Sequence, residues 1–466
     1  MITMLDRWQF AITTVYHFLF VPVSIGLALL VAVMQTLAYR KRDDKSGDKS
    51  GEEWDALARF FGKLFVINFA LGIATGIVQE FQFGMNWSNY SVFVGNIFGA
   101  PLAIEGLLAF FMESTFLGLW IFGRGKLAPR LHLATIWLVS VGTMLSALFI
   151  LAANAWMQHP VGYKVVGDRA ELTDFWALLA NSTLWAEFTH TVLAAITTGG
   201  MVMLGVSAWK LLRHRETAAF LRAAKLAAAV SLVAVIGVMV TGDIQARLMD
   251  TQQPMKMAAA EALYNTQSGA SFSILTVGNL SGNPIFQIRV PHLLSLIADM
   301  SWNGQVSGIH QVQAHEAATY GPGSYVPVIW LSYWSFRLMI GLGVVILAVA
   351  IGALWLARRK KLASSRWFLW AALLAIGAPF LANSFGWIFT EAGRQPWVVN
   401  GLMRTDQAIS PTVGAGSVAL TLAGFTLLYT VLGVIEVVLM ARYARRPLHD
   451  EEADTSGPAS SPALVY

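Results

Sequence analysis

Nine stretches of this sequence are each long and apolar enough to cross a lipid bilayer. A hydrocarbon core of about 30 Å requires about 20 apolar residues in a helix that rises about 1.5 Å per residue. The stretches lie near residues 10–38, 64–84, 94–123, 131–157, 184–209, 223–244, 326–357, 367–390 and 413–441. Of the 466 residues, 56% are hydrophobic and only 13% are charged. We therefore expect an all-α integral membrane protein with nine transmembrane helices.

The Lys and Arg residues between these stretches are distributed unevenly. Of the 32 Lys and Arg residues, 23 lie in alternate loops, at 39–63, 124–130, 210–225, 358–366 and 442–446. Cytoplasmic loops attract Lys and Arg, so the pattern predicts an N-terminus outside and a C-terminus in the cytoplasm. Because membrane orientation accounts for the net charge of +5, we expect no nucleic acid partner.

The chain divides into four parts by hydropathy. Residues 1–245 contain the first six spans, 246–325 form a large extracytoplasmic loop, 326–447 contain the last three spans, and 448–466 form a cytoplasmic tail. The loop is much longer than the others, and long ordered loops are often functional, so we expect a lid or binding loop. The tail has too few apolar residues to fold, and we expect it to be disordered.

Several kinds of site are excluded by composition and motifs. The chain contains no Cys, which removes disulfides, thiolate zinc sites, iron–sulfur clusters and Cys nucleophiles. A bound metal must therefore use His, Met or carboxylate ligands. The glycine residues form no GxxxxGK[ST] or GxGxxG motif, which disfavours a nucleotide-driven pump.

Two histidines lie well inside predicted spans, His17 in TTVYHFLF and His190 in WAEFTHTVLAA. An ionisable group at bilayer depth costs on the order of 3 kcal/mol, so each is a functional candidate. Both lie in the outer third of spans that run from outside to inside, which gives them a similar depth. Each could be a core imidazole bonded to a neighbouring helix or an iron ligand, and the presence of two favours iron ligands.

A third candidate ligand is Met339, which lies at a comparable depth in the seventh span. Met is the usual soft partner of His in low-spin haem, although a single Met among 17 is usually a packing residue. Arg337 favours the haem interpretation, because a buried cation could pair with a haem propionate. Helical spacing places the two side chains about 200° apart, so Arg337 must reach around the helix.

Carboxylates occur in two of the predicted spans. Glu105 and Glu113 are eight residues apart in the third span, hence about 12 Å along one broadly common face. Buried carboxyl groups can exchange protons near neutral pH, so the pair resembles a proton relay more than two capped side chains. Glu391 closes the eighth span beside Arg394, where a functional carboxylate and an ordinary interfacial salt bridge are equally consistent with the sequence.

The sequence disfavours two other kinds of metal site. Glu187 and His190 match the Glu-x-x-His unit of di-iron carboxylate bundles, but no other histidine has a Glu three residues before it, and such sites need the unit twice. A cytochrome with two bis-His haems needs four deep histidines, and the sequence has two. Haem with mixed ligands is the remaining option.

Taken together, the motifs resemble subunit I of the cytochrome bd-type quinol oxidases. The resemblance covers nearly the whole chain and rests on QFAITTVYHFLFVP (9–22), GNIFGAPLAIEGLLAFFMEST (95–115), ANAWMQHPVG (153–162), EFTHTV (187–192), FRLM (336–339) and GWIFTEAGRQPW (386–397). It implies an enzyme of the bacterial cytoplasmic (inner) membrane, with nine helices in this subunit. It also implies subunit II as a partner, small single-helix accessory subunits and contact with membrane lipid.

The same resemblance implies three haems: a low-spin haem b, a high-spin haem b and one haem d. It assigns His190 and Met339 to the low-spin haem b, with Arg337 steadying it. His17 and Glu391 resemble the ligands of the two high-spin centres, one each, and which of them ligates haem d stays open.

Further roles follow from the resemblance alone. Glu105 and Glu113 resemble the cytoplasmic proton path, and Trp387 resembles an aromatic spacer between haems. Lys256 and Glu261 match the Lys-x-x-x-x-Glu spacing of residues implicated in quinol oxidation, where a cation binds a quinone oxygen and a carboxylate accepts a proton. Without the resemblance, we would interpret these two as charges on a solvated amphipathic helix.

The sequence therefore predicts a terminal respiratory oxidase subunit. We expect quinol oxidation at the outer face and reduction of O2 to water with cytoplasmic protons, which generates a membrane potential without pumping. A proton-coupled transporter and an electron-conducting haem subunit without oxygen chemistry are the alternatives.

Overall fold

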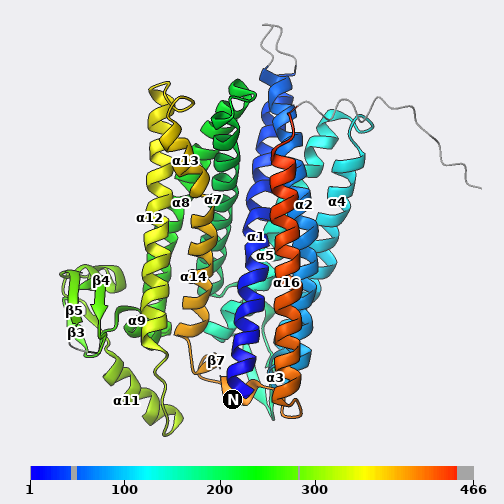
Figure 1. Ribbon diagram of the computed structural model, residues 1–466. Helices are drawn as coiled ribbons and strands as arrows, with labels where there is room; N and C mark the ends of the chain where they lie inside the picture. The colour runs from blue at the N-terminus through cyan, green and yellow to red at the C-terminus, as the bar shows by residue number, and fades with distance from the viewer. Residues whose placement is uncertain (1, 43–49, 282–283, 449–466) are drawn as a thin grey trace, which may run out of the picture.

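The computed structural model describes residues 2–42, 50–281 and 284–448. Within these residues, nine helical segments are long and apolar enough to cross a membrane, which confirms the predicted all-α membrane fold (Figure 1). The segments are α1 (Ile2–Arg40), α2 (Ser50–Asn86), the continuous unit α3 (Ser88–Ile104), η1 (Glu105–Phe110) and α4 (Phe111–Phe122), α5 (Pro129–Gln158), α7 (Ser182–Leu212), α8 (Thr217–Gln252), α12 (Ile329–Arg358), the pair α13 (Arg366–Leu374) and α14 (Gly377–Gly393), and α16 (Ala415–Ala444).

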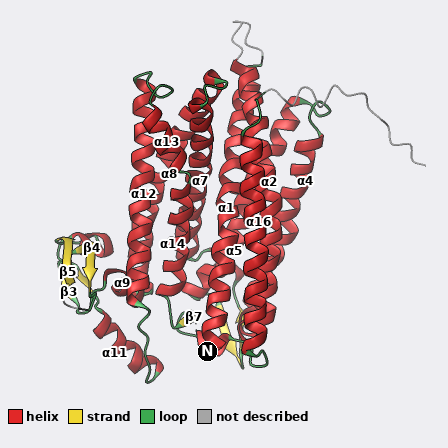
Figure 2. Ribbon diagram, viewed as in Figure 1, coloured by secondary structure: helices red, strands yellow, loops and turns green. Residues whose placement is uncertain are grey.

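The short elements lie between the spans. The short helices are α6 (Phe175–Leu179), α9 (Pro254–Glu261), α10 (Leu293–Asp299), α11 (Ile309–Tyr320) and α15 (Thr405–Ala408). The strands are β1 (Tyr163–Val166), β2 (Arg169–Leu172), β3 (Gln267–Ser268), β4 (Phe272–Gly278), β5 (Pro284–Val290), β6 (Gln305–Val306), β7 (Trp397–Val399) and β8 (Met403–Arg404). They form four antiparallel pairs, β1–β2, β3–β6, β4–β5 and β7–β8. The labelled strands in Figure 2 lie at the end of the bundle that holds the N-terminus.

The centre of the bundle is formed by α1 and α7, whose most apolar windows are each 67% buried. The two helices cross where Gly26 meets Gly199, because a Cβ atom on Gly26 would lie only 2.8 Å from the Gly199 Cα. Helix α2 packs on α1, and α8 packs on α7. The most exposed windows belong to α16 and α12, at 11% and 17% buried. Their apolar outer faces are suited to lipid or to another membrane subunit.

The loops alternate between the two ends of the bundle. In Figure 1, the N-terminus and the connection between α8 and α12 lie at one end, and the α4–α5, α7–α8 and α12–α13 loops lie at the other. This is the separation that the charge pattern predicts. Which end faces the cytoplasm stays a prediction.

Two spans depart from a regular α-helix. The eighth is divided into α13 and α14, because Pro379 has no N–H to donate and its ring crowds the carbonyl of residue 375. The Ala378 N–H donates to the Ala375 oxygen at 3.1 Å instead. The third contains the π-helical turn η1, which begins at Glu105. Such turns occur frequently at functional sites.

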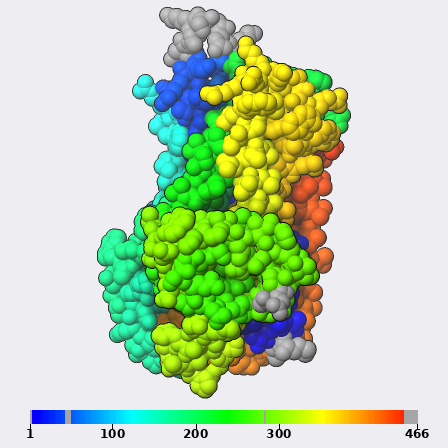
Figure 3. Space-filling view, turned by 90° about the vertical axis from the view of Figure 1, so that its left-hand side faces the viewer, coloured from blue at the N-terminus to red at the C-terminus, as the bar shows by residue number. Residues whose placement is uncertain are grey.

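The large connection covers residues 253–328 rather than 246–325. Residues 246–252 continue α8, which ends before Gln253, where the following Pro254 disfavours helical backbone. Within the connection, α9 is buried. The β4–β5 hairpin and α11 also belong to the connection and lie farther from the helix bundle than α9 does (Figure 1). Figure 3 shows this connection as the green surface that covers one side of the molecule's lower half. Apart from Leu448, the predicted tail 448–466 lies outside the described residues.

Candidate functional site

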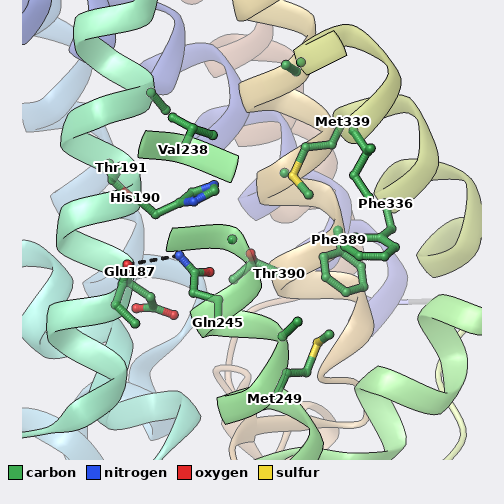
Figure 4. A pocket seen from close by; sticks show the side chains of 18 of the residues that line it. Glu187, His190, Thr191, Val238, Gln245, Met249, Phe336, Met339, Phe389 and Thr390 are labelled. Atoms are coloured by element: carbon green, nitrogen blue, oxygen red, sulfur yellow. Dashed lines mark hydrogen bonds between the residues drawn. The ribbon is translucent and has the colours of Figure 1, made fainter. Parts of the chain in front are cut away.

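A cavity of about 580 Å³ lies between α7, α8, α12 and α14. Its lining is mostly apolar, and His190 of α7 and Met339 of α12 approach it from facing walls (Figure 4). Lys256 of α9 and Glu187 of α7 also line it. Two possible ligands and two ionisable groups therefore share one largely apolar compartment.

The cavity offers the donor set of a low-spin haem. The His190 Nδ1 atom lies 3.1 Å from the Thr241 hydroxyl, and the Met339 sulfur lies beside Gly386, where a Cβ atom would be 3.2 Å away. An imidazole and a thioether inside an apolar cavity are ligands that suit haem iron. The residues present therefore fit a low-spin haem with mixed ligands.

His17 lies on α1, outside the lining of this cavity, and its Nδ1 atom is 2.9 Å from the Thr75 hydroxyl. The next residue, Phe18, does line the cavity and meets the Trp387 ring edge to face at 5.2 Å. Trp387 and Phe18 thus lie at the boundary between the His190 cavity and the surroundings of His17.

Glu391 lies one turn beyond Trp387 on α14 and forms an ion pair with Arg394. The Asn154 amide donates to its other oxygen at 3.3 Å. Arg394 also donates to the Val398 carbonyl, which ties the end of α14 to β7. The ion pair foreseen from the sequence is present and largely buried, and ligation by Glu391 stays a prediction.

Lys256 is connected to Glu391 through two amide side chains. The Lys256 Nζ donates to Gln158 Oε1 at 3.1 Å, and Gln158 Nε2 donates to Asn154 Oδ1 at 2.8 Å. Gln158 Nε2 also donates to Glu187, whose second oxygen is buried without a hydrogen-bond partner among the described residues. The sequence does not single out Gln158 or Asn154, and it suggests Glu187 only as a ligand of the disfavoured di-iron site. The sequence feature that could have identified Asn154 and Gln158 is that two amide side chains lie one turn apart at the end of an apolar span.

Burial lowers the pKa of the Lys256 ammonium to about 8. The carboxylates of Glu187 and Glu391 act against this shift, and Arg394 acts with it. Lys256 therefore titrates within an accessible pH range.

Arg337 and Glu261 form a buried ion pair of 2.6 Å, with side chains 6% and 2% exposed. Arg337 also donates to the carbonyls of Ser273 and Ala260, at 2.8 and 2.6 Å. Burial raises the pKa of the Glu261 carboxyl, although Arg337 opposes the shift. The guanidinium thus fastens the large connection to α12, and its pairing with a haem propionate stays a prediction.

The buried setting of α9 removes the solvated-helix interpretation of Lys256 and Glu261. Their side chains are 6% and 2% exposed. Lys256 faces the cavity, and Glu261 faces Arg337. The five-residue spacing therefore directs the two charges to different surroundings.

Glu105 and Glu113 both face α5. Ser146 donates to Glu105 at 2.5 Å, and Glu113 lies against Gly142, where a Cβ atom would be 2.6 Å from its Cγ. Gly142 and Ser146 are one turn apart on α5. Glu113 is 5% exposed, and its Oε1 has no hydrogen-bond partner in the described part of the chain. The two carboxyl groups thus follow one helix face through the third span.

Comparisons with known proteins match nearly the whole chain. The family model described as "Cytochrome bd terminal oxidase subunit I" matches residues 5–448. The chain is 48% identical to "Cytochrome bd ubiquinol oxidase subunit 1" of Bacillus subtilis (strain 168), over 97% of this chain and 95% of that protein. It is 37% identical to "Cytochrome bd-II ubiquinol oxidase subunit 1" of Escherichia coli (strain K12), over 95% and 96%.

A solved structure agrees with these matches. The bd oxidase from Geobacillus thermodenitrificans superposes with a TM-score of 0.86 at 26% sequence identity, covering 96% of this chain and 98% of that one. The similarity therefore extends to the arrangement of the helices.

Proposed function

Because the chain belongs to the cytochrome bd terminal oxidase subunit I family and is a quinol oxidase subunit, we propose that it oxidises quinol at the outer membrane face and reduces O2 to water. Protons for oxygen reduction come from the cytoplasm, so charge separation generates a membrane potential without pumping. The family implies haem cofactors, a multi-pass membrane location and a subunit II partner. The bacterial cytoplasmic membrane, accessory single-helix subunits and lipid contacts belong to the proposal.

The observation that supports this function best is the pair of His190 and Met339 on facing walls of one apolar cavity. These two residues would hold the low-spin haem b. His17 and Glu391 would hold the high-spin haem b and haem d, one each. Bound haem supplies one-electron transfer, which is chemistry that the side chains here do not provide.

At the quinol side, Lys256 and Glu261 have separate roles. The Lys256 ammonium, which lines the cavity, orients a quinol oxygen by donating a hydrogen bond. Glu261 accepts a proton through Oε1, which is buried without a partner among the described residues, while Oε2 stays bonded to Arg337. Glu113 and Glu105 hold protons along the path from the cytoplasm, and Trp387 excludes water beside the cavity.

A carbon monoxide difference spectrum of the purified membrane complex tests the function directly. We expect a far-red chlorin band that shifts with carbon monoxide, because an oxygen-reducing site must keep an open coordination position. A complex whose haem bands do not shift with carbon monoxide would favour the electron-conducting alternative. A colourless complex would return the chain to the transporter hypothesis.

The quinol role of Lys256 predicts a pH dependence. Because the pKa of Lys256 is about 8, its ammonium form dominates below pH 8 and is lost above it. The kcat/KM for quinol should therefore fall above pH 8, by about tenfold per pH unit. Steady-state quinol oxidation between pH 6 and 10 checks this.

Lys256→Arg is the matched variant, since a guanidinium stays protonated throughout this range. The decline should then disappear or move upward. The same decline in Lys256→Arg would contradict the quinol role of Lys256 and assign the titration to another group near it, where Glu187, Glu391 and Arg394 lie.

A further inference from the structure

Both candidate histidine ligands contact a Thr-Gly pair on the neighbouring antiparallel helix. His17 of α1 faces the pair at residues 75–76 of α2, and His190 of α7 faces the pair at residues 241–242 of α8. The Nδ1 to Oγ1 distances are 2.9 and 3.1 Å. The same dipeptide thus meets each imidazole in the same way at two separate places.

The threonine hydroxyls favour one tautomer of both rings. Thr75 donates its proton to the Gly72 carbonyl at 2.8 Å, and Thr241 donates its proton to the Gly237 carbonyl at 2.9 Å. A hydroxyl has one proton, so when the threonine gives that proton to the carbonyl its oxygen can only accept from the ring, and the ring then donates from Nδ1–H. Nε2 is then the nitrogen with a free lone pair, as a metal ligand requires.

The glycine of each pair faces the Cε1 atom of the imidazole. A Cβ atom on Gly76 would lie 3.2 Å from the His17 Cε1, which is closer than ordinary van der Waals contact. A Cβ atom on Gly242 would lie 3.5 Å from the His190 Cε1, which is ordinary contact. The threonine therefore contacts each ring at Nδ1. At Gly76 the missing side chain lets α2 approach His17 closely, whereas at Gly242 an alanine side chain would make ordinary contact with His190.

The two arrangements occupy equivalent positions in the bundle. His17 precedes Gly26 by nine residues, and His190 precedes Gly199 by nine. These glycines are in contact where α1 crosses α7. Both histidines therefore lie about 13 Å from one crossing point, along helices that run in the same direction. The pairs α1–α2 and α7–α8 thus carry similar histidine sites at the same distance from the crossing of α1 and α7.

We propose that the Thr-Gly pairs at 75–76 and 241–242 are positioning residues that hold His17 and His190 in the Nδ1–H tautomer with Nε2 directed at a haem iron. This inference rests on the proposed haem ligation by the two histidines. A hydrogen bond from Nδ1–H makes the imidazole a stronger electron donor, which favours the oxidised state of a bound haem. The threonines therefore help to set the haem midpoint potentials.

Thr241→Val is the decisive variant, because it keeps the shape and removes the hydroxyl. We expect the midpoint potential of the low-spin haem to rise and haem retention to fall by about tenfold, measured by redox titration and by haem content per chain. Thr241→Ser restores the hydroxyl and should restore both values. Thr241→Val with a wild-type potential and haem content would overturn the inference.

Thr197→Val is the matched control. Thr197 lines the same cavity and makes the same kind of bond, to the Leu193 carbonyl at 2.8 Å, but its hydroxyl contacts no imidazole among the described residues. The midpoint potential of the low-spin haem should not change in Thr197→Val. An equal shift in Thr197→Val would show that cavity hydration, rather than the histidine bond, causes the change.

His190→Ala separates this inference from the proposed function. If His190→Ala keeps the low-spin haem, the proposed ligation is wrong. If His190→Ala loses that haem while Thr241→Val behaves as wild type, only the positioning role fails. Thr75→Val, with Thr75→Ser as rescue, should give the corresponding shift in one of the two high-spin centres, and the absence of that shift would remove the equivalence of the two sites.

Discussion

Met339→Leu should abolish the low-spin haem signal while leaving the haem bound in a high-spin form. Leucine has nearly the same volume as methionine, so the packing of the cavity is preserved, but it lacks the thioether that would complete the axial pair with His190. The measurement is an electron paramagnetic resonance spectrum of the oxidised complex, together with its reduced-minus-oxidised optical spectrum. In the proposed function electrons from quinol enter at this centre, so quinol oxidase activity should fall with the low-spin signal.

Met249→Leu is the matched control for this result. Met249 is on α8 and lines the same cavity, as Figure 4 shows, so it is one of two alternative sulfur ligands, with Met239. We expect Met249→Leu to keep the low-spin signal. If Met249→Leu loses the signal and Met339→Leu keeps it, the axial pair is His190 with Met249 instead.

The fold was largely predictable because its determinants are local. Each span is a run of apolar residues whose required length is set by the bilayer, and the separation of the loops follows from where Lys and Arg lie. The depth of His17 and His190 was predictable for the same reason, since a polar residue inside an apolar run is conspicuous. Hydropathy could not reveal η1 or the division at Pro379, because both keep the same apolar composition and alter only the backbone bonding.

The contacts of the site were less predictable, because they join residues far apart in the chain. Arg337 was assigned to a haem propionate from its own span, but its partner in the structure is Glu261, 76 residues away. A charged residue in a loop helix does not interrupt an apolar run, so the sequence alone does not mark it as buried. Lys256 and Glu261 are therefore identified only by resemblance. Their burial follows from how the connection folds onto α12 and α14.

The Thr-Gly pairs illustrate the same limit. Thr and Gly are common in membrane helices, and nothing local distinguishes residues 75–76 or 241–242 from other such pairs. Their role is visible only once α2 and α8 are placed against the two histidines. A sequence shows which polar residues lie at bilayer depth, and the packing of antiparallel neighbours decides what each one bonds.

Glu113→Gln should slow oxygen reduction by about 10²-fold while leaving the haem spectra unchanged. Glutamine has the size of glutamate and fits against Gly142, but it cannot take up and release a proton. Steady-state oxygen consumption with excess quinol, measured beside the haem spectrum, separates loss of proton delivery from loss of cofactor. Wild-type turnover in this variant would contradict the assigned path.

Glu436→Gln is the control for the loss of a buried carboxyl group as such. Glu436 lies on α16 and lines a separate apolar cavity with Tyr16 and Phe380, away from the α5 face that Glu105 and Glu113 share. Its substitution should leave turnover unchanged.

Glu105→Gln tests whether both carboxyl groups lie on one path. Because Ser146 donates to Glu105, the glutamine in Glu105→Gln can keep that hydrogen bond and still lose proton exchange. Slow turnover in both Glu105→Gln and Glu113→Gln would therefore support one path along α5, whereas slow turnover in Glu113→Gln alone would show that protons leave Glu113 for the oxygen site without passing Glu105.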